Sequence, residues 1–149
     1  MFYQAIVARE GEHWLAEFPD CPGCQTFASS EAELAVEAKD AVEGWLEAHL
    51  VHGAVPPAPR VHRGANVLRV DINTSLAVRV QIRQARDAAK LTQGDLAQRA
   101  GVSQQQIAKL ERPGVNPSLA TLQKVADALG LVLDVRLDAS PKRRDGQAA

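Results

Sequence analysis

The apolar residues of this chain change their spacing near residue 75, and this change divides the sequence into two halves. In the first half, four short runs rich in β-branched, aromatic and apolar residues predict strands. These runs are residues 2–8, 13–18, 24–28 and 67–72. Ser30 followed by Glu33 fits a capping box, and apolar residues at helical spacing then predict a helix to about residue 50. Residues 53–66 hold three prolines and predict a connecting loop, so the order is β-β-β-α-β.

The second half keeps helical spacing from residue 75 to residue 129. We expect four helices, over residues 75–90, 92–100, 103–110 and from residue 116 or 118 to 129. The predicted inward positions of the first are Leu76, Val80, Ile82, Ala85 and Ala89. Those of the fourth are Leu119, Leu122, Val125, Ala126 and Leu129.

Residues 131–137 alternate apolar and polar positions, which predicts a short C-terminal strand. A lone strand needs a partner, so we expect it to pair with its copy in a homodimer or higher oligomer. The polar tail, residues 138–149, is expected to be disordered. The predicted fold class is α+β, with one domain over residues 1–74 and an all-α domain over residues 75–137.

Charge separates the same two halves. The whole chain has a net charge of −1, but residues 1–74 carry −6, residues 75–137 carry +4 and the tail carries +1. Two partners of opposite charge would fit such a division. No apolar run approaches the roughly 18 residues that span a bilayer, and the N-terminus lacks the pattern of a signal peptide. We therefore expect a cytoplasmic protein with no membrane partner.

Residues 91–111 have the pattern of a helix-turn-helix. Ala97 is small enough for two helices to cross closely, and Gly101 suits the turn between them. Apolar Ile107 and Leu110 would hold the second helix against the first. The first turn of that helix, with Gln104 and Gln105, is then left facing outward, where the major groove is contacted.

This stretch resembles the Xre-type, phage-repressor-like family of helix-turn-helix proteins over residues 80–131. The resemblance implies operator DNA as a partner, with Gln93 on a phosphate and Gln104 and Gln105 on base edges. A glutamine amide can both donate to and accept from adenine. The other candidate DNA-binding residues are Ser103, Gln106 and Lys109. Two alternatives stay open: Gln106 can instead complete a capping box with Ser103, and Lys109 and Arg112 can be ordinary solvated cations.

The first half resembles the N-terminal domain of HicB antitoxins over residues 2–50, through its hairpin, its Phe18–Cys24 loop (FPDCPGC) and the helix start at Ser30. The strand at 67–72 lies where that family has its last strand. The resemblance implies a partial RNase H-like fold that neutralises HicA, a small ribonuclease toxin. Many such proteins carry a C-terminal DNA-binding domain that represses their own operon.

Four acids of the predicted long helix, Glu33, Glu37, Asp40 and Glu47, lie close to one helix face. They are candidate toxin-binding residues, because a toxin that cuts RNA must itself be basic. The alternative is an ordinary solvated helix face. The first predicted strand, residues 2–8, contains no acid, whereas RNase H chemistry needs converging carboxylates on metal ions. We therefore expect no enzyme.

Cys21 and Cys24 form a C-x-x-C pattern, but Cys24 leads into a strand and not a helix. A zinc site would need two further ligands, and the histidines offer no matching spaced pair. We expect a structural turn, with no metal and no cofactor. The hypothesis is a type II antitoxin and autorepressor; the alternatives are a regulator whose first domain senses a small molecule, and a metal or redox enzyme that uses the C-x-x-C.

Overall fold

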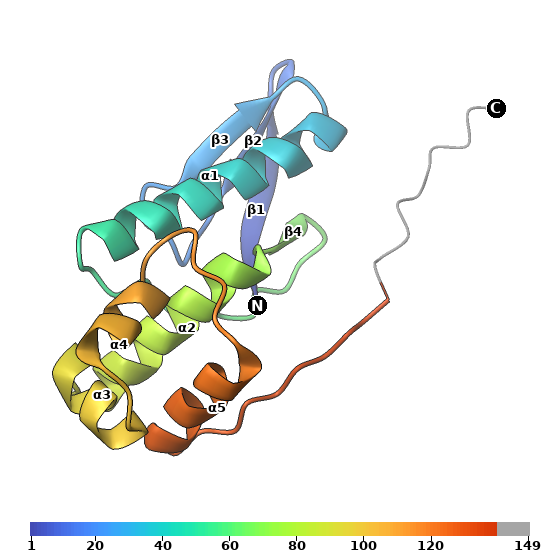
Figure 1. The fold of residues 1–149 in the computed structure, drawn as a ribbon. Coiled ribbons are helices and arrows are strands. Elements are labelled where there is room, and N and C mark those ends of the chain that lie inside the picture. Colours follow the sequence, from blue (N-terminus) through green and yellow to red (C-terminus); the bar gives the residue numbers. More distant parts are fainter. Residues whose placement is uncertain (140–149) are drawn as a thin grey trace.

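The computed structural model describes residues 1–139. It contains a four-stranded antiparallel sheet in the order β3-β2-β1-β4, with one long helix on its face and four helices beyond one end (Figure 1). We call the sheet and its helix the front lobe, and the four later helices the back lobe. The α+β class and the β-β-β-α-β order are confirmed. The tail, residues 138–149, is predicted from the sequence to be disordered. From residue 140 onward it lies outside the described residues.

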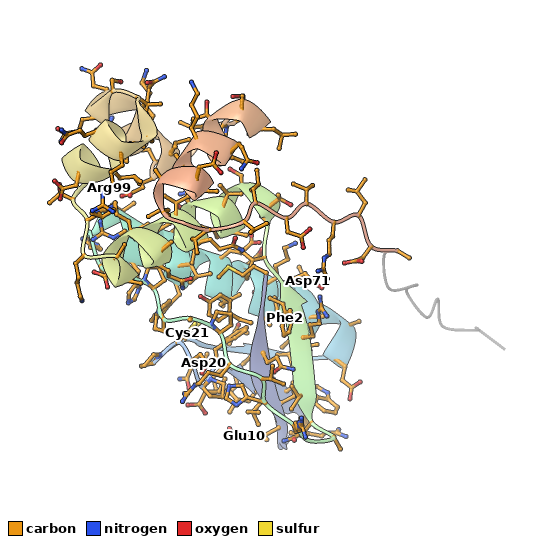
Figure 2. The ribbon with its side chains drawn as sticks, turned by 90° about the horizontal axis from the view of Figure 1, so that it is seen from below. Phe2, Glu10, Asp20, Cys21, Asp71 and Arg99 are labelled. Carbon is orange, nitrogen blue, oxygen red and sulfur yellow. The ribbon has the colours of Figure 1, made fainter. Side chains whose placement is uncertain are left out.

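The strands are β1 (Phe2–Glu10), β2 (His13–Glu17), β3 (Gln25–Ala28) and β4 (Val67–Asp71). Strand β1 is two residues longer than predicted and ends with an acid, Glu10. Its hairpin with β2 turns at Gly11, whose φ of +61° lies in the left-handed region that glycine adopts without strain. In Figure 2, Glu10 lies at the end of the sheet away from the back lobe.

Helix α1 (Glu31–Val51) begins with the predicted cap in a modified form. Ser30 Oγ accepts a hydrogen bond from Glu33 N at 3.2 Å, as a capping box requires. The Glu33 carboxylate accepts instead from Ser29 N at 2.9 Å, one residue before the expected donor. The buried face of α1 packs on the sheet residues that face it. This core includes Tyr3, Ala5, Ala16, Val70, Leu34, Ala38, Val42 and Leu46.

The back lobe consists of α2 (Thr74–Ala88), α3 (Gln93–Ala100), α4 (Gln104–Leu110) and α5 (Leu119–Ala128). Helix α2 takes part in both hydrophobic cores. Leu76 and Val80 belong to the front core, whereas Ile82 packs with Leu96 and Ile107 in the back core. The predicted boundary at residue 74 therefore lies just before a helix that the two lobes share.

Two predicted inward positions of the back lobe are wrong. Ala89 is exposed because it is the C-cap of α2, beyond the last turn that packs. Leu119 is 65% exposed, since it is the first residue of α5 and precedes its packed face. In their place, two charged residues of α2 are buried, Arg79 and Arg86.

The predicted strand at residues 131–137 is absent from the single chain. The N–H of Leu131 donates to Ala126 O at 2.9 Å, and the described residues that follow pair with no strand. The physical reason is that a strand requires a neighbour for its backbone hydrogen bonds, and the front-lobe sheet lies elsewhere. Pairing with a second copy stays a prediction.

Candidate nucleic-acid interface

The N-terminal turn of α4 is an exposed polar surface of the helix-turn-helix. Gln104 and Gln105 are both exposed, whereas Ile107 and Leu110 of the same helix are buried. The side chain of Gln104 lies over the start of α3, where its Oε1 is 3.5 Å from the point at which a Cβ on Gly94 would stand. No acid occurs between Ser103 and Leu110. The two glutamine amides are therefore presented to solvent on a helix turn that itself carries no acid.

The turn between α3 and α4 has the geometry that the sequence predicted. Gly101 has a φ of +67°, in the left-handed region, and Val102 N donates to Ala97 O at 3.1 Å. Ala97 is 4% exposed in the crossing between the helices. A larger side chain at Ala97 would push α4 away from α3, so this alanine sets the angle at which Gln104 and Gln105 project.

Gln106 has a local role in the structure. Its Oε1 accepts from Ser103 N at 2.9 Å, and its backbone N–H donates to Ser103 Oγ at 3.2 Å. This is a complete capping box, one of the two interpretations left open by the sequence. Lys109 is exposed in the last turn of α4. Contacts of Ser103, Gln106 and Lys109 with DNA stay predictions.

Gln93, the predicted phosphate contact, is held by a buried charge network. Its Nε2 donates to Glu111 Oε2 at 3.0 Å. Arg86 binds the same carboxylate through Nε at 2.7 Å and Nη2 at 3.0 Å, and donates from Nη1 to Leu91 O at 2.9 Å. Arg83 Nη1 lies 3.6 Å from Glu111 Oε2. One carboxylate thus joins α2, α3 and the end of α4 and orients the Gln93 amide.

Sequence reasoning missed this network. The sequence did contain a signal for it. Viewed along the axis of the predicted helix, Arg79 and Arg86 lie on the apolar face, between Leu76 and Ile82. Arginines within such a face require buried acceptors. Their partners, Glu47 and Glu111, are 32 and 25 residues away, so the sequence pattern alone does not identify them.

The candidate toxin-binding acids fall into two groups. Glu33, Glu37 and Asp40 are exposed on the side of α1 opposite the sheet. Glu47 instead pairs with Arg79 of α2, whose Nη1 donates to Glu47 Oε2 at 2.8 Å. Neighbouring Glu43 accepts from Asn73 N at 2.7 Å at the start of α2. The C-terminal half of the acidic face therefore also holds the back lobe in place.

The two cysteines are free and buried in the turn after β2, and Figure 2 shows Cys21 beside Asp20. Cys24 N donates to Cys21 O at 2.9 Å. Burial raises the pKa of Cys21 to about 12, with further contributions from Cys24 and Asp20, and burial raises the pKa of Cys24 to about 11. Thiols with such pKa values are uncharged at neutral pH and are therefore poor nucleophiles.

No helix within residues 1–139 is both long and apolar enough to cross a bilayer. In the same part of the chain, no three histidine, cysteine or acidic side chains gather where they could hold a metal ion.

Comparison with known proteins identifies the family. A helix-turn-helix family model matches residues 82–135, close to the 80–131 of the predicted resemblance. An immunity repressor protein of Bacillus phage phi105 is 45% identical over 56 residues, which are 38% of this chain and 39% of that protein. A helix-turn-helix transcriptional regulator of Sinorhizobium fredii is 38% identical over 63 residues, 42% of this chain and 30% of that protein. The chain therefore spans less than two fifths of the length of these two relatives.

One solved structure, titled "HicA3 and HicB3 toxin-antitoxin complex", contains a chain similar to this one at a TM-score of 0.43 and 22% identity. The match covers 49% of this chain and 99% of that one. A third relative is a helix-turn-helix transcriptional regulator of Methanothermobacter thermautotrophicus. It is 43% identical over 53 residues, 36% of this chain and 77% of that protein. Because the match includes more than two thirds of that relative, this chain belongs to the helix-turn-helix family.

Proposed function

We propose that this protein is the antitoxin and autorepressor of a type II toxin–antitoxin operon. In this proposal the back lobe binds operator DNA, and the front lobe neutralises a HicA-like toxin that cleaves mRNA. The observation that carries the proposal is the exposed pair Gln104 and Gln105 at the start of α4, in the matched helix-turn-helix segment. An amide at this place can form two hydrogen bonds to the edge of an adenine in the major groove.

The front-lobe half of the proposal is supported by the sequence resemblance of residues 2–50 and by charge. Residues 1–74 carry −6, and Glu33, Glu37 and Asp40 form an exposed acidic stripe on α1. Such a stripe would speed association with a basic, RNA-cutting partner. The proposal includes no catalysis by the front lobe, since Glu10, the one acid of β1, is exposed at the hairpin end.

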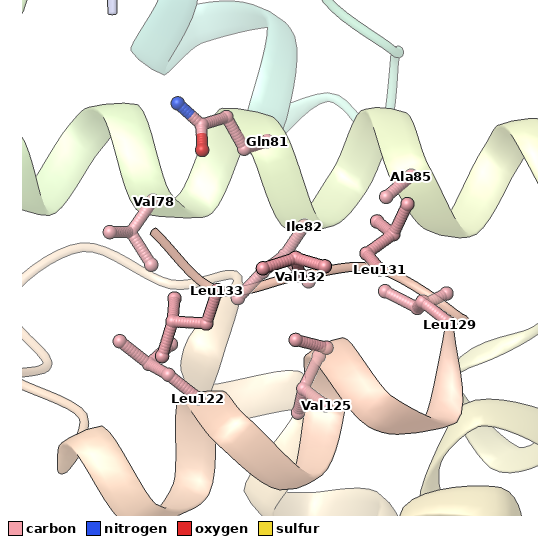
Figure 3. Close-up of a pocket in the computed structure, with 11 residues that line it drawn as sticks. Val78, Gln81, Ile82, Ala85, Leu122, Val125, Leu129, Leu131, Val132 and Leu133 are labelled. Atoms are coloured by element: carbon pink, nitrogen blue, oxygen red, sulfur yellow. The ribbon is translucent and has the colours of Figure 1, made fainter. Parts of the chain in front are cut away.

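We also propose that the operator-binding form is at least a dimer, because one helix-turn-helix contacts too few base pairs for tight binding. The C-terminal segment supplies the supporting observation. Residues 131–133 pass over a cavity of about 110 Å³ between α2 and α5, bordered by Ile82 and Val125 (Figure 3). In this segment and the residues after it, the side chains of Val132, Val135 and Leu137 remain 91%, 64% and 98% exposed. A second copy would cover these side chains and pair the backbone.

The test of the DNA-binding half begins with selection of a preferred duplex from a random library. We expect Gln104→Ala and Gln105→Ala to weaken binding to that duplex about tenfold or more, since an amide–adenine pair is worth about 1–3 kcal/mol. Binding to random duplex should change little. Gln123→Ala, which removes the same amide from an exposed position of α5, is the matched control and should leave binding to both duplexes unchanged. If Gln104→Ala and Gln105→Ala weaken binding to both duplexes by the same factor, the predicted contact of these glutamines with base edges is wrong.

The front-lobe half is tested by co-purification with a small basic protein encoded beside this one. Expression of this chain should also restore the growth of cells in which that protein is expressed. Failure of complex formation with such a protein would contradict the antitoxin proposal and leave the repressor proposal intact.

A second candidate is a transcriptional regulator whose front lobe senses a small molecule. A cleft of about 420 Å³, bordered by Arg9, Trp14 and Leu34, favours it, because ligand sites commonly have volumes of about 300–1,000 Å³. Native mass spectrometry separates the candidates: a retained small molecule supports the sensor, and a retained basic protein supports the antitoxin.

A further inference from the structure

A cleft separates the C-terminal end of α1 from the helix-turn-helix. Its volume is about 350 Å³. Leu50, Val51 and Gly53 line it from the front lobe, and Gln93 and Arg112 line it from the back lobe. In Figure 1 the segment after α4 rises toward α1, in agreement with this lining. The front lobe therefore lies directly beside Gln93, the predicted phosphate contact.

The cleft carries an excess of positive charge. Arg83 and Arg112 line it, and Glu111 is the one acid of its lining; the carboxylate of Glu111 is already bound by two hydrogen bonds from Arg86, which lies outside the lining. Arg83 Nη1 is 3.6 Å from the same carboxylate, and Arg83 Nε is buried without a hydrogen-bond partner among the described residues. Arg112 is exposed at the cleft. Two arginines against one carboxylate leave the lining with a net positive charge, which is complementary to an added anion.

The end of α1 is suited to lie beside an anion. The last carbonyls of a helix normally repel negative charge. Here His49 O accepts from Ala54 N at 2.9 Å, Leu50 O accepts from Gly53 N at 3.1 Å, and Gly53 O accepts from Arg83 Nη2. The half-buried apolar side chain of Leu50 lowers the local dielectric constant, which strengthens attraction between an arginine and an anion.

We propose that the C-terminal end of α1, residues 50–53, is part of the DNA-contacting surface. It forms one wall of a binding site for a backbone phosphate of the duplex that α4 contacts, and Gln93 and Arg112 form the other wall. This inference rests on the proposed DNA binding. It gives the front lobe a direct role in holding DNA, in addition to its proposed role in binding a toxin.

The chain offers a matched pair of variants on one helix. Val51 borders the cleft and is 69% exposed, whereas Val36 lies in the first half of α1 and is 57% exposed. Val51→Glu and Val36→Glu make the same change in net charge. The two positions are about 22 Å apart along the helix, from a rise of about 1.5 Å per residue. Charge effects at 0.15 M salt are screened beyond about 8 Å, so Val36→Glu should not influence the cleft.

The first measurement is the affinity of the full chain for random-sequence duplex by fluorescence anisotropy at 0.15 M salt. We expect Val51→Glu to weaken binding at least fivefold, because its carboxylate repels the phosphate, and Val36→Glu to stay within twofold of wild type. The second measurement is an NMR titration with inorganic phosphate at constant ionic strength. The amides of residues 50–53 and the Gln93 side chain should shift in the wild type and in Val36→Glu, but not in Val51→Glu.

Three results would overturn the inference. Equal duplex affinities of Val51→Glu and Val36→Glu, with no phosphate-induced shifts, would show that α1 does not contact an anion, while the proposed function would stand. Equal duplex affinities together with phosphate-induced shifts would assign the cleft to a free phosphate compound instead of DNA. A wild-type chain that binds no duplex would refute the proposed DNA binding itself, and the DNA contact of α1 with it.

Discussion

At the scale of single residues, Asp20 helps to position the connecting loop. It is 5% exposed in the turn after β2, and its carboxylate accepts from Arg60 N at 2.9 Å and Arg60 Nε at 2.7 Å. His62 Nε2 lies 3.0 Å from the same carboxylate. Burial by itself would raise the pKa of Asp20, but the hydrogen bonds from Arg60 and His62 outweigh it and lower this pKa below its usual value. A single acid thus holds residues 60–62 against the sheet.

Asp20→Asn should lower the free energy of unfolding at pH 7 by about 2 kcal/mol, the usual worth of hydrogen bonds to a charged group. Because the folded-state pKa of Asp20 is lowered, its charge stabilises the fold above about pH 4. This contribution disappears as the pH falls through the folded-state pKa. Urea unfolding at pH 7, 4 and 3 should show the difference between wild type and variant shrinking with acid. Glu12→Gln, at an exposed position, is the control, and a difference that is constant with pH would contradict the assignment.

At the scale of elements, the carboxylate of Glu111 fixes the arrangement of the helix-turn-helix. It binds Arg86 of α2 and Gln93 of α3 from a position just after α4. Both Glu111 and Arg86 have side chains that are only 9% exposed. Removing one member of such a pair leaves the other as an uncompensated buried charge. This lowers the free energy of unfolding more than replacing both members by apolar residues does.

Glu111→Gln is therefore expected to lower the free energy of unfolding by about 3 kcal/mol, the lower end of the range for breaking a buried pair. Chemical denaturation of the full chain measures it. Glu37→Gln removes an equal charge from an exposed position of α1 and should stay within about 0.5 kcal/mol of wild type. A loss below about 1 kcal/mol for Glu111→Gln would show that Arg86 finds another acceptor.

At the scale of the whole molecule, α2 couples the two lobes. Its first half belongs to the front core and its second half to the back core. Arg79, which is 4% exposed, pairs with Glu47 of α1, and Gln84 Nε2 donates to Pro56 O at 2.9 Å. A displacement of α1 is therefore passed to the helix that supports α3 and α4. The lobes are expected to move as one body.

The exposed C-terminal segment predicts the oligomeric state. Deleting residues 131–149 should convert the proposed dimer to a monomer in sedimentation equilibrium, because it removes Val132, Val135 and Leu137, three strongly exposed apolar side chains. Deleting only residues 139–149 leaves these side chains in place and should preserve the dimer. A dimer of unchanged affinity after the longer deletion would refute pairing through this segment.

Most elements of the fold follow from the sequence pattern. The richness of residues 2–8 in aromatic, β-branched and apolar side chains predicted a strand, and the capping residues Ser30 and Ser103 predicted helix starts that the structure contains. The outward position of Gln104 and Gln105 also followed, because Ile107 and Leu110 could only face inward. These features depend on residues within about one turn or one strand of each other, so local spacing determines them.

The tertiary structure alone decided which distant groups meet. The sequence contains Arg86 and Glu111, Arg79 and Glu47, and Asp20 and Arg60, but no local rule pairs residues 25 to 40 positions apart. It also decided that residues 131–137 form no strand within one chain, since a strand exists only beside another. The sequence by itself determined the elements and the outward glutamines of α4. The packing of α1 against α2 decided that the acidic lobe lies beside the predicted phosphate contact, because that placement depends on buried contacts between elements distant in the chain.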